Sequence, residues 1–178
     1  CNKFYNKIIM NKFVYVKDNM LSKKDCDNII KTCDKNLSPS LDYQGYEYYD
    51  IKKMKLWKFL VDKTILVIND YLKEYPELNL TTNPFALTNI RFKKFKKGKS
   101  FGSWHSEHCI DYPHRILNIM YYLSDHDCGT KFYDGEVVLS KKGRAIVFPS
   151  YFTHTHKGQV CPQGDTRYIL TGYIEFTK

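Results

Sequence analysis

The chain has 178 residues, 43% of them hydrophobic, which is enough for one domain with a core that needs no metal or disulfide to hold it together. Its formal net charge of +9 is compatible with an acidic partner such as a nucleic acid, an anionic metabolite or an acidic peptide, although a lysine-rich surface also serves solubility. No apolar run approaches the length of a membrane span, and the first residues lack the apolar core of a signal peptide. We therefore expect a single soluble, cytoplasmic domain over residues 1–178.

Six cysteines are scattered along the chain, and none forms a Cys-x-x-Cys pair. A chain of this length and hydrophobic content does not need a disulfide framework, so we predict free thiols in a reducing, intracellular compartment. The six positions are Cys1, Cys26, Cys33, Cys109, Cys128 and Cys161.

The N-terminal part predicts a strand and then a helix. Lys12–Lys17 is rich in β-branched and aromatic residues, as strands are. Ser22 fits a helix N-cap, with Asp25 three residues on, close to a capping box. The helix that follows would place four apolar residues on one buried face: Cys26, Ile29, Ile30 and Cys33.

The next segment, residues 36–50, is rich in turn formers and tyrosines and has no evident period. It is interpreted as a packed irregular connection, with a loop over a binding cleft as the alternative. Ile51–Tyr75 then predicts a helix that Pro76 would end. Its expected apolar face consists of Met54, Trp57, Phe59, Leu60, Val61, Ile65, Ile68 and Leu72.

From Pro84 onward the pattern is typical of strands separated by short turns. Phe85–Phe95 predicts a strand that leads into a hairpin turn at Lys96–Lys99. Six of the nine residues from Arg91 to Lys99 are basic. We interpret them as charges that protect an edge strand from aggregation, with a phosphate-contacting edge as the alternative.

Five further strands are predicted, at His114–Leu123, Thr130–Tyr133, Glu136–Leu139, Arg144–Phe148 and Arg167–Phe176. Helices first and many short strands afterwards indicate an α+β, mainly β fold, a β-sandwich or barrel with helices packed outside. The strand and helices would occupy residues 1–84 and the β core residues 85–178.

Histidines and a carboxylate suggest a metal site in the β-rich half. All six histidines lie between residues 105 and 156. In His105-x-Glu107 the two side chains would share one face of an extended segment. His154 and His156 could each add a third ligand, and two imidazoles with one carboxylate suit Fe(II) oxygenase chemistry.

Several motifs, in order, resemble the Fe(II)/2-oxoglutarate-dependent dioxygenases of the prolyl and lysyl hydroxylase type. They begin with residues 21–30, similar to the opening strand, turn and helix of that family. They continue with Phe95-x-x-Gly98, His105-x-Glu107, Tyr122-Leu123-Ser124, Gly129-Thr130-x-Phe132, Lys142-Gly143, Phe148-Pro149-Ser150, His156-Lys157-Gly158 and Gly164-Asp165-Thr166-Arg167-Tyr168. The resemblance covers residues 12–176, and its last segment is the most specific.

The resemblance implies a double-stranded β-helix, or jelly roll, with the metal near its mouth. It implies that Fe(II) binds to His105, Glu107 and a later histidine. The lysyl hydroxylase branch has a similar Thr-His-x-His-x-Gly tract whose second histidine binds iron, which selects His156, and His154 would then be a cleft or surface residue. It further implies that Arg167 pairs with the distal carboxylate of 2-oxoglutarate, a role that suits a planar guanidinium in a cleft.

Two positions depart from the family pattern. Glu107 stands where relatives more commonly have Asp. Phe95 stands near the position where relatives often have a tyrosine that hydrogen-bonds the cosubstrate. Another hydroxyl would have to serve in its place, and Tyr122, Thr171 and Tyr173 are the candidates. Trp104 is expected in the core beside the site. His108, His114 and His126 fit no motif position and are expected to be solvent-facing or hydrogen-bonded.

These observations predict an oxidoreductase, a 2-oxoglutarate-dependent dioxygenase that hydroxylates a prolyl or lysyl side chain of a peptide and releases succinate and CO2. Fe(II), 2-oxoglutarate and O2 would be required, with ascorbate as reductant. A free amino acid, a nucleobase or another small molecule is the alternative substrate. A non-catalytic basic β-helix module that binds nucleic acid is the alternative from another class.

Overall fold

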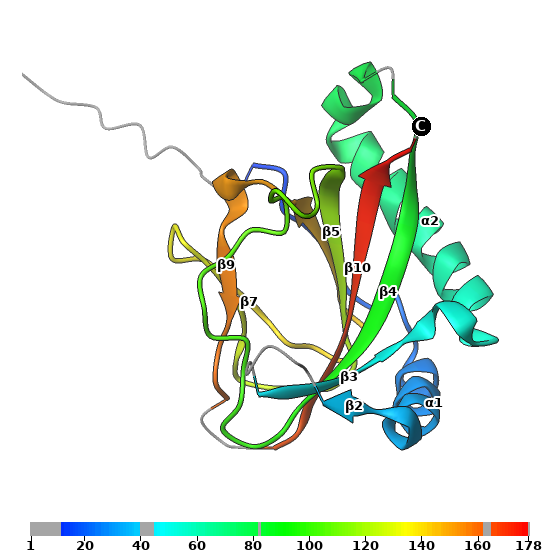
Figure 1. Ribbon diagram of the computed structural model, residues 1–178, viewed down its shortest axis with the longest axis vertical. Coiled ribbons are helices and arrows are strands. Elements are labelled where there is room, and N and C mark those ends of the chain that lie inside the picture. Colours follow the sequence, from blue (N-terminus) through cyan, green and yellow to red (C-terminus); the bar gives the residue numbers. More distant parts are fainter. Residues whose placement is uncertain (1–11, 40–44, 82, 162–164, 178) are drawn as a thin grey trace, which may run out of the picture.

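The computed structural model describes residues 12–39, 45–81, 83–161 and 165–177. Within these ranges no helix has both the length and the apolar character needed to cross a membrane. Two sheets form the core, and two helices cover one of them (Figure 1). Residues 1–11 and the predicted turn residues Gln163 and Gly164 lie outside the described part.

The N-terminal elements follow the predicted order. Strand β1 (Tyr15–Lys17) precedes helix α1 (Lys23–Cys33). Ser22 and Asp25 form the reciprocal capping box, which satisfies two backbone N–H groups that the first turn cannot pair internally. Cys26, Ile29 and Cys33 are buried, as their spacing predicts.

Helix α2 (Leu56–Glu74) is shorter than predicted, and its buried face is partly different. Residues Ile51–Lys53 form a separate 3-10 turn, and a second one, Pro76–Leu80, begins at the predicted stop. Ile65 is 52% exposed, so its place on the predicted apolar face is wrong. The face that packs on the sheet repeats every three to four residues and consists of Leu60, Thr64, Val67, Ile68 and Tyr71.

The strands form one sheet of seven and one of three. The remaining strands are β2 (Ser38–Pro39), β3 (Tyr46–Asp50), β4 (Phe85–Phe95), β5 (Arg115–Tyr122), β6 (Gly129–Phe132), β7 (Val137–Leu139), β8 (Ala145–Pro149), β9 (His156–Gly158) and β10 (Arg167–Phe176). The major sheet has the order β1-β8-β5-β10-β4-β3-β2 and the minor sheet β7-β6-β9. The pairing and order of the strands in the two sheets are those of the predicted double-stranded β-helix. Residues 12–80 supply the helices.

Three predictions about strand β4 and its neighbours are wrong. Tyr46–Asp50 is a strand, not an irregular connection, and it pairs with β4 along its whole length. Strand β4 therefore lies between β10 and β3, so its basic residues do not protect an edge. A turn does close at Lys96–Lys99, but the next strand along the chain, β5, does not pair with β4, so the turn makes no hairpin.

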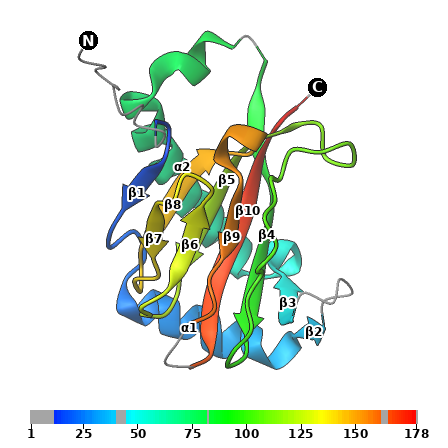
Figure 2. The same ribbon diagram turned by 90° about the vertical axis from the view of Figure 1, so that its left-hand side faces the viewer.

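The major sheet separates two apolar cores. One lies between this sheet and the helices and includes Leu60, Val67 and Leu170, while the other lies between the two sheets and includes Phe132 and Phe148. The minor sheet stands in front of β8, β5 and β10, with the helices behind them (Figure 2). Because both faces of the major sheet are covered, every residue of β5 is buried.

The prediction of free thiols is wrong for two cysteines. Cys128 and Cys161, 33 positions apart, form a disulfide that ties the start of β6 to the segment after β9. Cys26, Cys33 and Cys109 are free thiols, as predicted. Isolated cysteines without a close-spaced pair give no sequence signal for such a bond, because chain folding alone brings them together. The predicted intracellular location rested partly on these thiols and stays a prediction.

Candidate metal and cosubstrate site

Three side chains between the two sheets converge on one point. One ligand atom from each of His105, Glu107 and His156 lies within 4.8 Å of the other two, close enough for a single metal ion to join them. The imidazole rings of the two histidines are 4.3 Å apart, and Nε2 of His105 is 3.5 Å from Oε1 of Glu107. The predicted third ligand is thus beside the His-x-Glu pair.

Both imidazoles are oriented for metal binding by their second ring nitrogen. Nδ1 of His105 lies 2.9 Å from the carbonyl oxygen of Ser103, and Nδ1 of His156 lies 3.0 Å from that of His154. Because a carbonyl can only accept, each Nδ1 must carry the proton. Each Nε2 then keeps its lone pair for a metal, which is the arrangement that metal-binding histidines usually show.

Backbone hydrogen bonds bring the two parts of the site together. His105 and His156 exchange both of their N–H to carbonyl bonds, at 3.0 and 2.9 Å, as an isolated antiparallel bridge. The N–H of Glu107 donates to the carbonyl of Ser150, directly after β8. The segment that carries His105 is therefore attached to β9 at single points, although it forms no strand of its own.

The electrostatics of the site favour a cation. Burial, together with the neighbouring His105, lowers the pKa of His156 to about 4, so the imidazole is neutral near pH 7. Burial by itself would raise the pKa of Glu107, but the neighbouring His105 and the charge of Lys93 bring it to about 2. The site thus offers a neutral imidazole and an ionised carboxylate, the forms that bind metals.

Arg115, at the start of β5, fixes the second oxygen of Glu107. Its Nη1 donates to Oε2 of Glu107 at 3.2 Å, while its Nε donates to Oε1 of Glu175 at 3.3 Å. The guanidinium carbon lies 3.6 Å from the ring centres of both Tyr112 and Tyr173. This contact holds the planar cation in place, so Oε1 of Glu107 is left facing His105.

Arg167 opens strand β10 and lines the same cavity as the three metal-binding candidates. It is 3% exposed, its Nη1 donates to the carbonyl of Gly129 at 3.3 Å, and its carbon lies 4.8 Å from the centre of the Phe95 ring. A Cβ on Gly158 would stand 3.1 Å from Nη2, so glycine leaves room for the guanidinium. Its Nε is buried without a partner in the described residues, which suits a carboxylate ligand.

The three predicted hydroxyl candidates all line this cavity. Tyr122 donates to Oγ1 of Thr130 at 2.7 Å, and burial raises the pKa of its phenol to about 12. Oγ1 of Thr171 is buried without a partner among the described residues, so it has bonding capacity to spare. Tyr173 also lines the cavity, beneath Arg115, and Phe95 offers no hydroxyl.

None of the other described histidines belongs to the cluster of three candidates. Nε2 of His154 is 2.9 Å from the carbonyl of Lys12, which makes it a buried structural residue rather than a ligand. His108 and His126 are each hydrogen-bonded, and His114 is exposed, as predicted.

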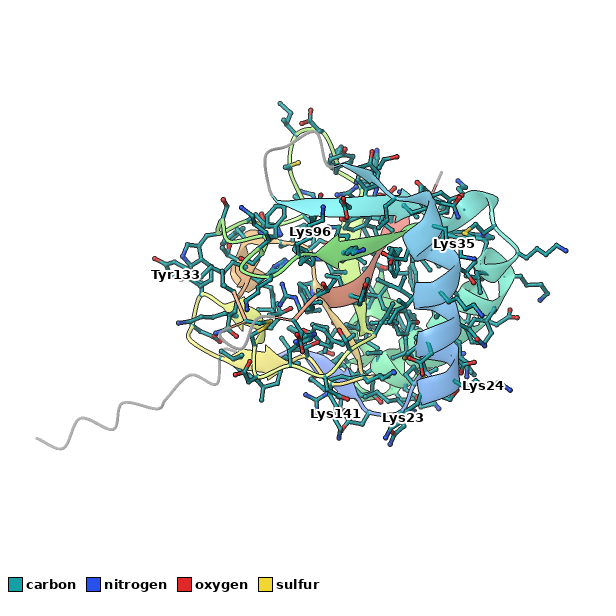
Figure 3. All side chains as sticks on the ribbon, turned by 90° about the horizontal axis from the view of Figure 1, so that it is seen from below. Lys23, Lys24, Lys35, Lys96, Tyr133 and Lys141 are labelled. Carbon is teal, nitrogen blue, oxygen red and sulfur yellow. A yellow bond between two sulfur atoms is a disulfide. The ribbon has the colours of Figure 1, made fainter. Side chains whose placement is uncertain are left out.

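Trp104 is 39% exposed and contacts Tyr133 and Lys157, so its predicted place in the core is wrong. Figure 3 shows Tyr133 on the side of the molecule opposite α1. Trp104 directly precedes the inward-facing His105, and neighbours along an extended segment face opposite ways.

Sequence reasoning missed two cations of the site, Arg115 and Lys93. Both belong to strands that were predicted correctly, yet neither lies in a motif that suggests a ligand. For Lys93 the available signal was the alternation of side chains along β4, which places Lys93 on the same face of the sheet as Phe95.

Comparison with known families now identifies the fold and its chemistry. Residues 90–175, from the middle of β4 to the end of β10, match the model of the 2OG-Fe(II) oxygenase superfamily. The matched residues, just under half of the chain, have the sequence pattern of this superfamily. The protein is a 2-oxoglutarate-dependent dioxygenase that uses Fe(II) and O2. No curated protein matches its sequence.

Solved structures of this superfamily share the fold at low identity. A viral collagen prolyl hydroxylase of Paramecium bursaria Chlorella virus-1, in complex with 2-oxoglutarate, is 19% identical, with a TM-score of 0.72 over 96% of this chain and 99% of that one. A prolyl hydroxylase of Trichoplax adhaerens with a hypoxia-inducible factor peptide is 14% identical, with a TM-score of 0.67 over 94% and 87%. HygX of Streptomyces hygroscopicus, with nickel, 2-oxoglutarate and hygromycin B, is 10% identical, with a TM-score of 0.69 over 92% and 83%.

Proposed function

We propose that the chain hydroxylates a C–H bond of a prolyl side chain in a peptide, with a lysyl side chain as the alternative target. The substrate carbon gains one oxygen atom of O2, and 2-oxoglutarate gains the other as it loses CO2 and becomes succinate. The observation that carries the proposal is the shared cavity, where His105, Glu107 and His156 lie together with the buried Arg167.

His105 and His156 would hold Fe(II) through their Nε2 atoms, and Glu107 through Oε1. Three ligands leave the remaining positions of the metal open, and bound Fe(II) there supplies the redox chemistry that activates O2. Arg115 keeps the carboxylate of Glu107 in place through Oε2, at 3.2 Å. The two carbonyl partners of the histidines fix the ring orientations before any metal arrives.

Arg167 would bind the distal carboxylate of 2-oxoglutarate. Burial lowers the pKa of its guanidinium from the ordinary value, and a carboxylate partner offsets that cost of desolvation. Thr171 would add a hydroxyl contact through its buried Oγ1, and the phenol of Tyr122 lies in the same cavity. The apolar side chains of Phe95, Met120 and Ile169 line the space between and limit the access of water.

The peptide part of the proposal is supported by the names of similar structures. Two of them are prolyl hydroxylases, one of collagen and one with a peptide fragment bound. HygX, whose structure contains hygromycin B, supports a small molecule as the second candidate substrate. The nucleic-acid-binding alternative stays a prediction. Many lysines, including Lys94, Lys96, Lys141 and Lys142, are engaged in ion pairs with acidic residues.

The test is the formation of succinate and of hydroxylated product from proline-containing and lysine-containing peptides, with Fe(II), 2-oxoglutarate, O2 and ascorbate as reductant. Anaerobic calorimetry of 2-oxoglutarate binding accompanies it, on the parent and on Arg167→Ala, with Mn(II) in place of Fe(II). Loss of a charged partner in a buried pair should weaken binding by about 100-fold or more. Lys141→Ala, which removes an exposed cation, is the control. Absence of turnover by protein that binds both metal and 2-oxoglutarate would refute the proposal.

A further inference from the structure

Strand β5 places a buried side-chain amide inside the cavity. Asn118 is 3% exposed and lines the same space as Glu107 and His156. Its Oδ1 accepts a hydrogen bond of 3.1 Å from the hydroxyl of Ser150. Its Nδ2 is buried and has no partner among the described residues. The amide therefore keeps an unused donor, and a buried donor without a partner is costly unless a ligand supplies the acceptor.

Ser150, directly after β8, fixes both the amide and the segment that carries Glu107. Its carbonyl accepts the N–H of Glu107 and the N–H of His108, each at 3.0 Å. Its own N–H donates to the carbonyl of Ile116 at 2.9 Å, which attaches it to β5. Because the hydroxyl of Ser150 occupies Oδ1 of Asn118, Nδ2 is the end of the amide that is left for a ligand.

Asn118 lies away from the residues proposed for the distal carboxylate of 2-oxoglutarate. Asn118 and Tyr122 share the cavity face of β5 and are four residues apart, which is about 13 Å along a strand. On β10, Tyr173 lies opposite Asn118, whereas Arg167 begins the strand six residues earlier. The five-carbon chain of 2-oxoglutarate spans only about 5 Å when it is extended. A cosubstrate held by Arg167 therefore ends before it reaches Asn118.

We propose that Nδ2 of Asn118 donates to a main-chain carbonyl oxygen of the substrate, in one of the two peptide bonds that flank the target residue. This inference rests on the proposed function and selects a peptide over a free amino acid. When a C–H bond of a prolyl residue faces the metal site, the carbonyl oxygens of these two peptide bonds are the nearest acceptors that the residue offers. A neutral carbonyl suits the position, because the ionised Glu107 would repel a free carboxylate there.

The experiment replaces one acceptor atom of the ligand at a time. A blocked hexapeptide with one central proline, taken from the peptide that the parent binds most tightly in the test of function, is made in three forms. One has only oxygen, and the others have sulfur in place of the carbonyl oxygen before the proline or of the proline itself. Sulfur is a weak hydrogen-bond acceptor. Anaerobic calorimetry measures peptide binding to protein loaded with Mn(II) and 2-oxoglutarate, and hydroxylation with Fe(II) is measured in parallel.

Three variants accompany the parent. Asn118→Leu removes the donor at nearly constant volume, and Ser150→Ala keeps the donor but frees the amide to rotate. Asn69→Leu, at an exposed position of α2, makes the same exchange outside the cavity. Unchanged affinity for Mn(II) and 2-oxoglutarate is expected in all three, and it also shows that each variant is folded.

We expect the parent to bind the oxygen peptide about 10-fold more tightly than one of the two sulfur peptides, as for one buried hydrogen bond. The sulfur peptide that binds weakly identifies which of the two carbonyls is bound. In Asn118→Leu the ratio of the two affinities should fall to about 1, since neither form then meets a donor, and in Ser150→Ala it should fall to about 3. Asn69→Leu should keep the ratio of the parent.

A ratio in Asn118→Leu that equals the ratio in the parent would overturn this inference, and so would equal affinity of the parent for all three peptides. Loss of 2-oxoglutarate affinity in Asn118→Leu would assign the amide to the cosubstrate and overturn it as well. If Asn118→Leu also loses Mn(II), the ratio in Ser150→Ala decides in its place.

The proposed function and this inference can fail separately. Hydroxylation of the peptide by the parent, with no dependence of the ratio on Asn118, would leave the proposed function standing and overturn this inference alone. A ratio that depends on Asn118, without hydroxylation of any peptide, would support the peptide subsite and refute the proposed prolyl activity.

Discussion

At the scale of single residues, the least expected feature is the support of Glu107 by Arg115. A glutamate has one more rotatable bond than the aspartate that relatives commonly place there, so its carboxylate is less confined by its own backbone. Arg115 restores that confinement because its guanidinium is held between Tyr112 and Tyr173 and donates to Oε2. The longer ligand thus depends on a residue of strand β5.

Arg115→Met should therefore weaken Mn(II) binding by about 10-fold to 100-fold, the range typical of residues that orient a metal ligand. Calorimetric titration of the metal into the apo protein measures it. Arg115→Lys should recover part of the affinity, since an ammonium can still pair with one oxygen. Arg144→Met, which breaks the ion pair with Asp18 elsewhere, is the control. Parent-like affinity in Arg115→Met would show that Glu107 needs no support.

At the scale of elements, α2 is attached to the major sheet by one face only. Leu60 is fully buried in the core between helix and sheet, and Thr64 shares a buried hydrogen bond of 3.0 Å with the phenol of Tyr121 on β5. Leu60→Ala should lower the free energy of unfolding by about 2–5 kcal/mol, because it leaves a cavity. Ile65→Ala, on the exposed face, should change it by no more than about 0.5 kcal/mol. Urea denaturation measures both, and equal effects would contradict this packing.

A second element-scale contact joins the turn after β1 to the residue before β8. Arg144 and Lys141 both donate to the carboxylate of Asp18, and these bonds lower its pKa from 3.8 to about 2. The folded state therefore favours ionised Asp18. Its contribution is fully present above the unfolded pKa near 4 and is lost as pH falls through about 2.

Asp18→Asn should thus lower the free energy of unfolding by about 1 kcal/mol at pH 7, a figure reduced for the partial exposure of the carboxylate. The difference between parent and variant should shrink as pH falls from about 4 to 2. Urea denaturation of both proteins across this range measures it. A difference that stays constant with pH would show that the ion pairs contribute nothing.

The sequence predicts the long elements well because their signals are local. Strands β4 and β10 have the predicted bounds, and the capping box of α1 is present. Strand β3 was missed because Tyr46–Asp50 has no apolar alternation, and it is a strand through pairing with β4.

That pairing also explains the error about the basic residues of β4. Whether a strand is central or at an edge depends on partners from distant parts of the chain, so Lys93 could not be assigned to a cavity from the sequence. The metal-ligand candidates were predictable because a motif relates His105, Glu107 and His156, whereas the contact between Arg115 and Glu107 depends on geometry alone.

At the scale of the whole molecule, the metal site joins segments that the fold attaches only loosely. Between Lys99 and His114 the described chain contains only an isolated bridge at His105 and no strand. Mn(II) at 100 times its dissociation constant should raise the free energy of unfolding by about 2.7 kcal/mol. It should also slow amide exchange around residues 101–108, as measured by hydrogen–deuterium exchange. His156→Ala should abolish both effects, and protection without metal would contradict this view.

The disulfide has a consequence for the cosubstrate. Cys128 contacts Nη1 of Arg167 through its sulfur, at 3.6 Å, and the same sulfur is bonded to Cys161. The three metal-ligand candidates touch neither cysteine in any described contact. Reduction of the disulfide and removal of the metal would thus affect separate parts of one cavity. A dithiol reductant should weaken the binding of 2-oxoglutarate while the affinity for Mn(II) stays the same. Reduction would then lower the activity of the enzyme through weaker binding of the organic acid, while the metal stays bound.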